Sequence, residues 1–319
     1  MKYLAMSALL AFASLTNTAS AQEVTLRAIN GFQGGTYFAK DFEAFVEKVN
    51  EEGKGLVQIR LVGGPEAIPT MEQGAALASG VVDLAHTTVA FTASIVPEGL
   101  AYNYATLPFA ELRENGSVEY LNEIMARKNL MYWGRTGDLI NYHIYLTEPI
   151  DKPELKGAKI RIAPAFRPFF QAMGANVVQI APGEVYTALE RGVVDGYGWP
   201  IIGIFDMGWQ EVTKYRVDPG FYMLELGIQF NINSWNKLND EQKDFLEKQR
   251  DWLEERALRN SIASAEAESA RQAKEGIQSI KFSEEETEAF LRLSQDTAWR
   301  EIIRASPEYG PKLREMMAP

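Results

Sequence analysis

Residues 76–83 read ALASGVVD and residues 188–195 read ALERGVVD, so one octapeptide pattern occurs twice in the chain. The copies agree at six of eight positions and begin 112 positions apart. Each is typical of a helix end, a glycine (Gly80 or Gly192) that terminates the helix, and a short apolar strand. Two explanations are open: any helix–glycine–strand unit resembles another, or two α/β domains are built on one plan.

The segments around both copies favour the second explanation. In the first half, residues 24–28 and 57–61 alternate like strands, and residues 37–49 carry apolar side chains at helical spacing. In the second half, strands are expected over 158–162 and 177–180, and helices over 166–173 and 183–191. This β-α-β order predicts an α/β protein with two mostly parallel sheets flanked by helices.

A long charged segment from Asp240 to about Gly276 predicts one helix, with Asn239 or Asp240 as its N-cap. Phe245, Leu246, Leu253 and Ala257 lie on one of its faces. Such a helix is too long for one small domain. It is either a solvated surface helix or a spine that both domains share.

The composition excludes several classes of protein. The 319 residues include no cysteine and only two histidines, which excludes a catalytic cysteine, disulfides and cysteine-ligated metals, and disfavours a multi-histidine site. The formal charge of −11, from 32 basic and 43 acidic residues, argues against a nucleic-acid or anionic-membrane partner. The apolar content of 46% is ample for a sizeable core.

No catalytic motif is found: the G-x-S-x-G, P-loop, G-x-G-x-x-G and H-E-x-x-H patterns are all absent. Asp83 and Asp195 are expected to end strands, where each could act as a base or, as we favour, hold a turn. His86 and His143 are isolated and are interpreted as satisfied hydrogen-bonding residues. Nothing in the sequence therefore supports an enzyme.

The first 21 residues, MKYLAMSALLAFASLTNTASA, have the order of a secretory signal peptide. Lys2 precedes an apolar run, and Ala19-Ser20-Ala21 is an A-x-A cleavage site. Thr16, Asn17 and Thr18 interrupt the run before it could span a membrane. We expect cleavage after Ala21 and export to the periplasm.

Arg161 is placed differently from most basic residues, because it lies inside the apolar strand Ile160-Arg161-Ile162. A charge there is costly unless it is paired. Ligands of α/β proteins bind beyond the carboxyl ends of parallel strands, and arginine holds a carboxylate through two parallel hydrogen bonds. From the residues alone, an internal ion pair and a bound carboxylate are equally good explanations.

Three stretches carry a more specific resemblance: LKGAKIRI (155–162), MGA (173–175) and GEVYTALERGVVDG (183–196). Leu107-Pro108-Phe109 and the Trp235…Leu238…Glu241-Gln242 entry into the long helix add to it. Together they resemble the solute-binding proteins of tripartite ATP-independent periplasmic (TRAP) transporters. The resemblance implies a two-lobed receptor of the periplasmic-binding-protein type, with chain crossovers and a long helix shared by both lobes. Such a receptor closes on an organic acid and delivers it to a membrane permease.

The resemblance implies lobe I over residues 22–140 plus about 228–265, and lobe II over 141–227 plus about 266–319. It gives Arg161 the role of the carboxylate-binding arginine. Sialic-acid binders carry Asn-Pro where this chain has Trp199-Pro200, and a second arginine at the place of Asn141. Members that resemble 2-oxo-acid binders carry Glu-Trp, where the glutamate helps to hold a cation. Gly198 stands in place of that glutamate here, so we expect neither metal nor cofactor.

The remaining candidate ligand-binding residues are aromatic or polar: Phe32, Tyr102, Asn141, Tyr197 and Trp199. With one arginine they predict a monocarboxylate with an apolar or aromatic body, or a 2-oxo acid. A dicarboxylate would need a second cation, for which Arg135 is the candidate. A monomeric transport receptor is the favoured interpretation. A sensory receptor on the same fold and a periplasmic enzyme are the alternatives.

Overall fold

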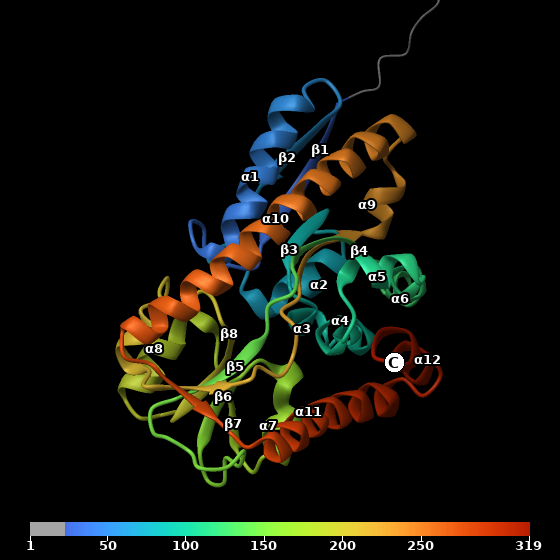
Figure 1. The fold of residues 1–319 in the computed structure, drawn as a ribbon. Helices are drawn as coiled ribbons and strands as arrows, with labels where there is room; N and C mark the ends of the chain where they lie inside the picture. The colour runs from blue at the N-terminus through green and yellow to red at the C-terminus, as the bar shows by residue number, and fades with distance from the viewer. Residues whose placement is uncertain (1–22) are drawn as a thin grey trace, which may run out of the picture.

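A computed structural model describes residues 23–319 as two lobes, each built on one β-sheet (Figure 1). The first sheet has the order β2-β1-β3-β10-β4. Its strands are β1 (Val24–Asn30), β2 (Val57–Leu61), β3 (Leu84–Thr87), β4 (Leu130–Gly137) and β10 (Leu226–Asn231). The expected signal peptide and its cleavage after Ala21 lie outside the described residues.

The second sheet repeats the plan of the first. Its order is β11-β9-β5-β8-β6-β7. Its strands are β5 (Tyr142–Leu146), β6 (Lys159–Ile162), β7 (Asn176–Gln179), β8 (Gly196–Pro200), β9 (Tyr215–Asp218) and β11 (Gln278–Lys281). One strand in each sheet is antiparallel to its neighbours, β10 in the first and β5 in the second, and they occupy corresponding places. The prediction of two mostly parallel sheets is confirmed.

Helices flank both sheets, and their apolar faces explain where they pack. The helix α1 (Tyr37–Glu52) buries Phe38, Phe42, Phe45 and Val49, which recur at helical spacing, against the first sheet. The first lobe also contains α2 (Gln73–Ala78), α3 (Val89–Thr92), α4 (Ala101–Tyr104), α5 (Phe109–Glu114) and α6 (Ser117–Ala126). In the second half lie α7 (Arg167–Ala172), α8 (Val185–Glu190), α9 (Ile232–Asn236), α10 (Asp240–Lys274), α11 (Glu284–Ala305) and α12 (Gly310–Met317).

The two octapeptides form the same structure in the two lobes. Gly80 follows α2 and Gly192 follows α8, with φ of 78° and 63°, a conformation that side-chain-bearing residues rarely adopt. The carbonyl of Gly80 accepts a hydrogen bond from Arg27 Nη2 (2.8 Å), and that of Gly192 accepts one from Lys159 Nζ (3.1 Å). The repeated pattern is therefore a repeated fold, and the first explanation is not needed.

The two aspartates hold the turns, as we favoured. The carboxylate of Asp83 accepts from the backbone N–H of Arg27 (2.8 Å) and pairs with its guanidinium (2.9 Å). The carboxylate of Asp195 likewise accepts from the N–H of Lys159 (2.8 Å). The expectation that these aspartates end strands is wrong, because β3 and β8 begin directly after them. Each aspartate instead ties the start of its strand to the neighbouring parallel strand.

The chain crosses between the lobes twice in adjacent segments. Residues 138–141 connect β4 of the first sheet to β5 of the second, and residues 219–225 connect β9 back to β10. The two crossovers are paired: Leu224 N donates to Ile140 O (2.5 Å) and Tyr142 N to Tyr222 O (2.8 Å). The expected crossovers are present, and they place a two-stranded connection between the lobes.

The helix α10 is the spine that both lobes share, as the resemblance implied (Figure 1). It begins at the N-cap Asn239 with a capping box and runs for 35 residues, about 52 Å at 1.5 Å per residue. Near its middle, Glu254 pairs with Arg113 of the first lobe (2.7 Å). Near its end, Gln272 bonds Arg216 Nη1 (2.8 Å) and Ile201 O (2.6 Å) of the second lobe.

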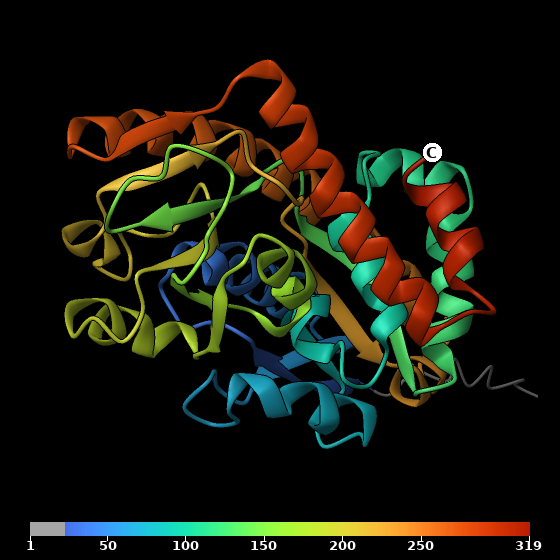
Figure 2. The same ribbon diagram turned by 90° about the horizontal axis from the view of Figure 1, so that it is seen from below.

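The C-terminal helices return to the first lobe (Figure 2). The helix α11 packs against α7 and α4, and α12 packs against α4 and α6, where Thr106 N donates to Met317 O (3.0 Å). The sequence placed residues 266–319 in the second lobe, and the exact lobe bounds stay a prediction. No helix among residues 23–319 is long and apolar enough to cross a membrane.

Candidate functional site

A small cavity of about 20 Å³, room for one water molecule, lies between the lobes and is lined equally by both. From the first sheet and its connections come Phe32, Phe38, Thr88, Ala90, Phe91, Leu224 and Leu226. From the second come Tyr142, Arg161, Ala163, Phe166, Gly198, Trp199 and Pro200.

The repeated topology explains where this cavity lies. Phe32 and Thr88 follow the carboxyl ends of β1 and β3, while Ala163 and Pro200 lie at the carboxyl ends of β6 and β8. Parallel strands that point the same way end at one edge of their sheet, and each lobe presents this edge to the other. Crevices at such edges are the usual ligand sites of α/β proteins.

Arg161 is the cation of the cavity. Its side chain, on β6, is 1% exposed, and its Nε donates to Ile180 O (2.9 Å). Its Nη2 is buried without a hydrogen-bond partner, and no carboxylate within residues 23–319 pairs with it. Burial lowers the pKa of the guanidinium to about 10, so it stays charged at neutral pH. The alternative of an internal ion pair is thus not realised, and the charge is available to an anion.

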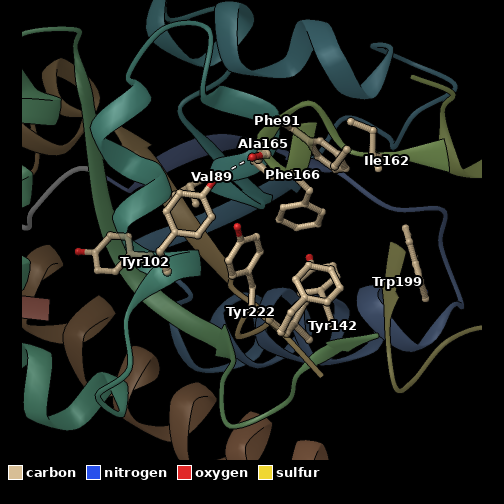
Figure 3. Close-up of a cluster of buried hydrophobic side chains, with 14 of the residues drawn as sticks. Val89, Phe91, Tyr102, Tyr142, Ile162, Ala165, Phe166, Trp199 and Tyr222 are labelled. Atoms are coloured by element: carbon tan, nitrogen blue, oxygen red, sulfur yellow. Dashed lines mark hydrogen bonds between the residues drawn. The ribbon is translucent and has the colours of Figure 1, made fainter. Parts of the chain in front are cut away.

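The walls of the cavity are aromatic (Figure 3). Trp199 lies 5.4 Å from the Arg161 guanidinium, packs edge-on against Phe38 (5.7 Å), and has a buried Nε1–H without a partner. Phe166 packs against Tyr142 (4.7 Å), and both rings lie between Tyr102 and Trp199 in the cluster. The cavity therefore offers hydrogen-bond donors beside large apolar surfaces.

Gly198 has no side chain, and the space beside its Cα is occupied by the ring of Phe170. A Cβ at this position would lie 3.1 Å from the Phe170 ring. The space that a longer side chain would need is therefore occupied by an aromatic ring from α7. Within residues 23–319, no group of three or more His, Cys, Asp or Glu side chains is placed to hold a metal ion.

The structure brings together three of the six predicted ligand-binding residues: Arg161, Trp199 and Phe32 line the cavity. Tyr197 lies outside the lining, stacked on Tyr145 (4.9 Å). Asn141 is exposed in the crossover, bridged to Met223, because β5 begins only after it.

Tyr102 is fully buried against Tyr132 (4.4 Å), away from Trp199. It belongs to α4, which packs under the crossovers rather than at the strand ends that line the cavity.

Arg135, the candidate second cation, is also absent from the lining. It is 3% exposed on β4, donates to Asp138 Oδ1 (3.3 Å) and lies over the Phe109 ring (5.0 Å). Burial acts to lower its pKa, but the nearby Tyr132, Asp138 and Glu225 raise it above its usual value. Among residues 23–319, the cavity lining therefore contains one cationic side chain, that of Arg161.

Glu225 is the buried acid beside Arg135, between two leucines that line the cavity. Its Oε2 accepts from Thr88 Oγ1 (2.9 Å) and Val89 N (2.7 Å), which fastens the second crossover to α3. Burial raises the pKa of this carboxyl, and the charge of Arg135 opposes the rise. Glu225 therefore holds the second crossover to α3 and does not itself line the cavity.

The comparison with protein families is decisive for identity. The family model for bacterial extracellular solute-binding proteins, family 7 (DctP), matches residues 33–305. The chain belongs to this family, the solute-binding proteins of TRAP transporters.

Individual members differ considerably from this solute-binding protein. A monocarboxylate 2-oxoacid-binding periplasmic protein from Nostoc is 27% identical over 63% of this chain, and the match spans 58% of that protein. A TRAP solute-binding protein from Bordetella bronchiseptica, with calcium and picolinate, superposes with a TM-score of 0.81 at 20% identity, covering 93% of this chain and 92% of that one. One from Rhodoferax ferrireducens with malonate gives 0.79 at 18%, covering 92% and 96%. At these identities the structures show the fold alone.

Sequence reasoning missed several lining residues of this solute-binding protein. Thr88 and Ala163 directly follow β3 and the Arg161 strand, so the rule that ligands bind beyond the carboxyl ends of parallel strands could have found them. Tyr142, Leu224 and Leu226 come from the crossovers and the antiparallel strands. No local pattern marks them.

The two histidines of this solute-binding protein are structural, as interpreted. His86 Nε2 bonds Thr136 Oγ1 (2.7 Å), and its ring stacks on Phe42 (4.9 Å). His143 Nδ1 lies 2.9 Å from Val217 O and 3.0 Å from Asp218 Oδ1. Burial lowers the pKa of His86 to about 3.

We expect His86 to make the protein less stable as the pH falls. Folded His86 stays neutral down to about pH 3, whereas the unfolded chain binds this proton near pH 6.5. Its stability contribution is complete above pH 6.5 and declines by up to about 1.4 kcal/mol per pH unit below it. Urea unfolding from pH 7 to 4.5 should show a steeper fall for the unmodified protein than for His86→Gln. The raised carboxyl pKa of Glu225 acts in the opposite direction but is common to both proteins. Equal slopes would contradict the prediction.

Proposed function

We propose that this protein is the periplasmic receptor of a TRAP transporter and captures a monocarboxylate with a compact apolar or aromatic body, 2-oxo acids included. The observation that carries the proposal is Arg161: a charged guanidinium, 1% exposed, with a free Nη2 and no carboxylate partner among the described residues. A buried cation of this kind is stabilised when an anion binds, and its fork matches a carboxylate.

The other polar groups support an acceptor-rich ligand with one charge. Arg161 Nη2 and Trp199 Nε1 are both unpartnered donors at the cavity. Arg135 is held by Asp138 outside the lining, so a second carboxylate would meet no cation there. The remaining lining is mainly aromatic and aliphatic, which suits a flat or apolar body. The name of the Nostoc relative, a monocarboxylate 2-oxoacid-binding protein, points the same way.

Binding requires the lobes to move, because a cavity of about 20 Å³ is smaller than an organic acid. Single hydrogen bonds join the lobes near the cavity: Tyr104 Oη donates to Ala165 O (2.7 Å), and Tyr37 N donates to Asp206 Oδ2 (2.5 Å). These bonds can open while the paired crossovers act as the hinge. The closed receptor would then deliver its ligand to the membrane permease, with which TRAP solute-binding proteins work.

A thermal-shift screen of organic acids at constant ionic strength tests the proposal. Compact monocarboxylates should raise the melting temperature most, since ligand at 100 times its Kd stabilises by about 2.7 kcal/mol. The neutral amide of the best acid is the matched control and should have no effect. X-ray scattering should then show a smaller radius of gyration in the complex. A larger shift from dicarboxylates, or an equal one from the amide, would refute the ligand class.

A further inference from the structure

A second hollow, of about 450 Å³, lies between α7 and α11 and shares no lining residue with the interlobe cavity. The two helices lie side by side (Figure 1) and are joined through Phe169 and Phe290, whose rings are 5.3 Å apart. The hollow is lined by Arg167, Pro168, Gln171, Ala172, Thr297, Arg300, Glu301 and Arg304. Its size is within the range of small-ligand sites.

The charge of this hollow is opposite to that of the protein. Three arginines and one glutamate line it, on a chain whose formal charge is −11. Arg304 pairs with Glu301 (Nε–Oε2 3.0 Å), but no carboxylate within residues 23–319 pairs with Arg167 or Arg300. Elsewhere on α11, Arg292 has its own glutamate, Glu288 (4.0 Å). Positive charges gathered without partners repel one another, so an anion between them would be stabilised.

The arrangement suits an oxyanion. Arg300 and Arg304 are one helical turn apart and lie on the same face of α11, while Arg167 faces them from α7. Guanidinium groups from two helices can hold the oxygens of one phosphate or carboxylate through parallel hydrogen bonds. We propose that the hollow between α7 and α11 is a second anion site that binds a phosphate or carboxylate group independently of Arg161.

Inorganic phosphate is the probe that tests this site. Isothermal titration of the full mature protein, with ionic strength held constant by sodium chloride, should show saturable binding. The double variant R167Q/R300Q should weaken it at least about tenfold, because two charge-assisted contacts are lost. The matched control is R60Q/R191Q, which removes the same charge from two exposed arginines that pair with no carboxylate within residues 23–319. This control should bind phosphate normally, and so should Arg161→Met.

A second arm identifies the source of the oxyanion. Flotation with phosphatidylglycerol vesicles, against phosphatidylcholine vesicles, measures whether a lipid phosphate occupies the hollow. If R167Q/R300Q loses the binding of phosphate in solution, the hollow binds a free anion. If R167Q/R300Q also loses the binding to phosphatidylglycerol vesicles, the hollow binds a lipid headgroup. Equal behaviour of R167Q/R300Q and R60Q/R191Q in both arms would overturn the site. Arg161→Met removes only the cation of the interlobe cavity. A loss of phosphate binding in R167Q/R300Q therefore tests the second site, and a loss of organic-acid binding in Arg161→Met tests the proposed function, so the failure of one can be told from the failure of the other.

Discussion

Replacing Arg161 with alanine is expected to weaken binding of the best acid from the screen by about 30-fold to several thousand-fold. Truncation leaves the ligand carboxylate buried without its partner, and such losses cost roughly 2–5 kcal/mol. Arg161→Lys keeps the charge but loses the planar fork, so it should recover only part of the affinity. Isothermal titration of the purified variants measures both effects.

Arg161→Met separates a binding role from a structural one. Methionine has a similar volume but no charge, and in the ligand-free protein Arg161 has no carboxylate partner within residues 23–319. Replacing an unpaired buried charge by an apolar side chain is neutral or stabilising. The ligand-free variant should therefore melt at the same or a higher temperature while its affinity falls. Arg191→Ala, an exposed arginine of the same lobe, is the matched control for affinity. A normal affinity in Arg161→Met would refute the carboxylate anchor.

Replacing Arg135 with methionine should have the opposite consequence for stability. Arg135 lies 3.3 Å from Asp138, and its charge opposes the rise that burial causes in the pKa of the Glu225 carboxyl. Removing one partner of a buried charge cluster leaves the others uncompensated, which costs about 3–5 kcal/mol. Urea unfolding at pH 7 measures the loss.

The double variant R135M/E225Q tests the cause of that loss. It should recover part of the stability, because the second substitution removes the uncompensated acid. The control Arg259→Met breaks an exposed pair with Glu255 and should cost less than about 1 kcal/mol. A loss for Arg135→Met as small as this control's would show that the cluster does not hold the crossovers.

Much of the fold was predictable because it rests on local patterns. The repeated octapeptide predicted two lobes on one plan, since Gly80 and Gly192 mark positive-φ helix ends and the aspartates mark the turns. Asn239 and the charged segment after it predicted the long helix α10 and its N-cap. The strand positions relative to Asp83 and Asp195 were misjudged, because the backbone bonds that start each ladder come from a strand far away in the chain.

The candidate site was predictable only in part. Arg161 was selected by a charge inside an apolar strand, Phe32 by its place after the first strand, and Trp199 by the tryptophan that it matches in the TRAP solute-binding proteins. Tyr197 was chosen because it follows the second Val-Val-Asp, yet it packs against Tyr145 and Trp209 and does not line the cavity. The difference lies in how neighbouring strands pack, which alternation along one strand does not encode.

By itself, the sequence determined the α/β plan, the repeated turns, the long helix and the place of Arg161 inside an apolar strand, because each depends on residues close together in the chain. Only the tertiary structure decided which residues share the cavity. Leu224, Leu226 and Tyr142 reach it through two crossovers that carry the chain from one lobe to the other. It also decided that Arg135 belongs to Glu225 and Asp138 rather than to a ligand. The physical reason is that the function of a buried charge depends on whether an opposite charge lies beside it in the folded protein. Such a neighbour can come from a segment remote in sequence, as Glu225 does for Arg135.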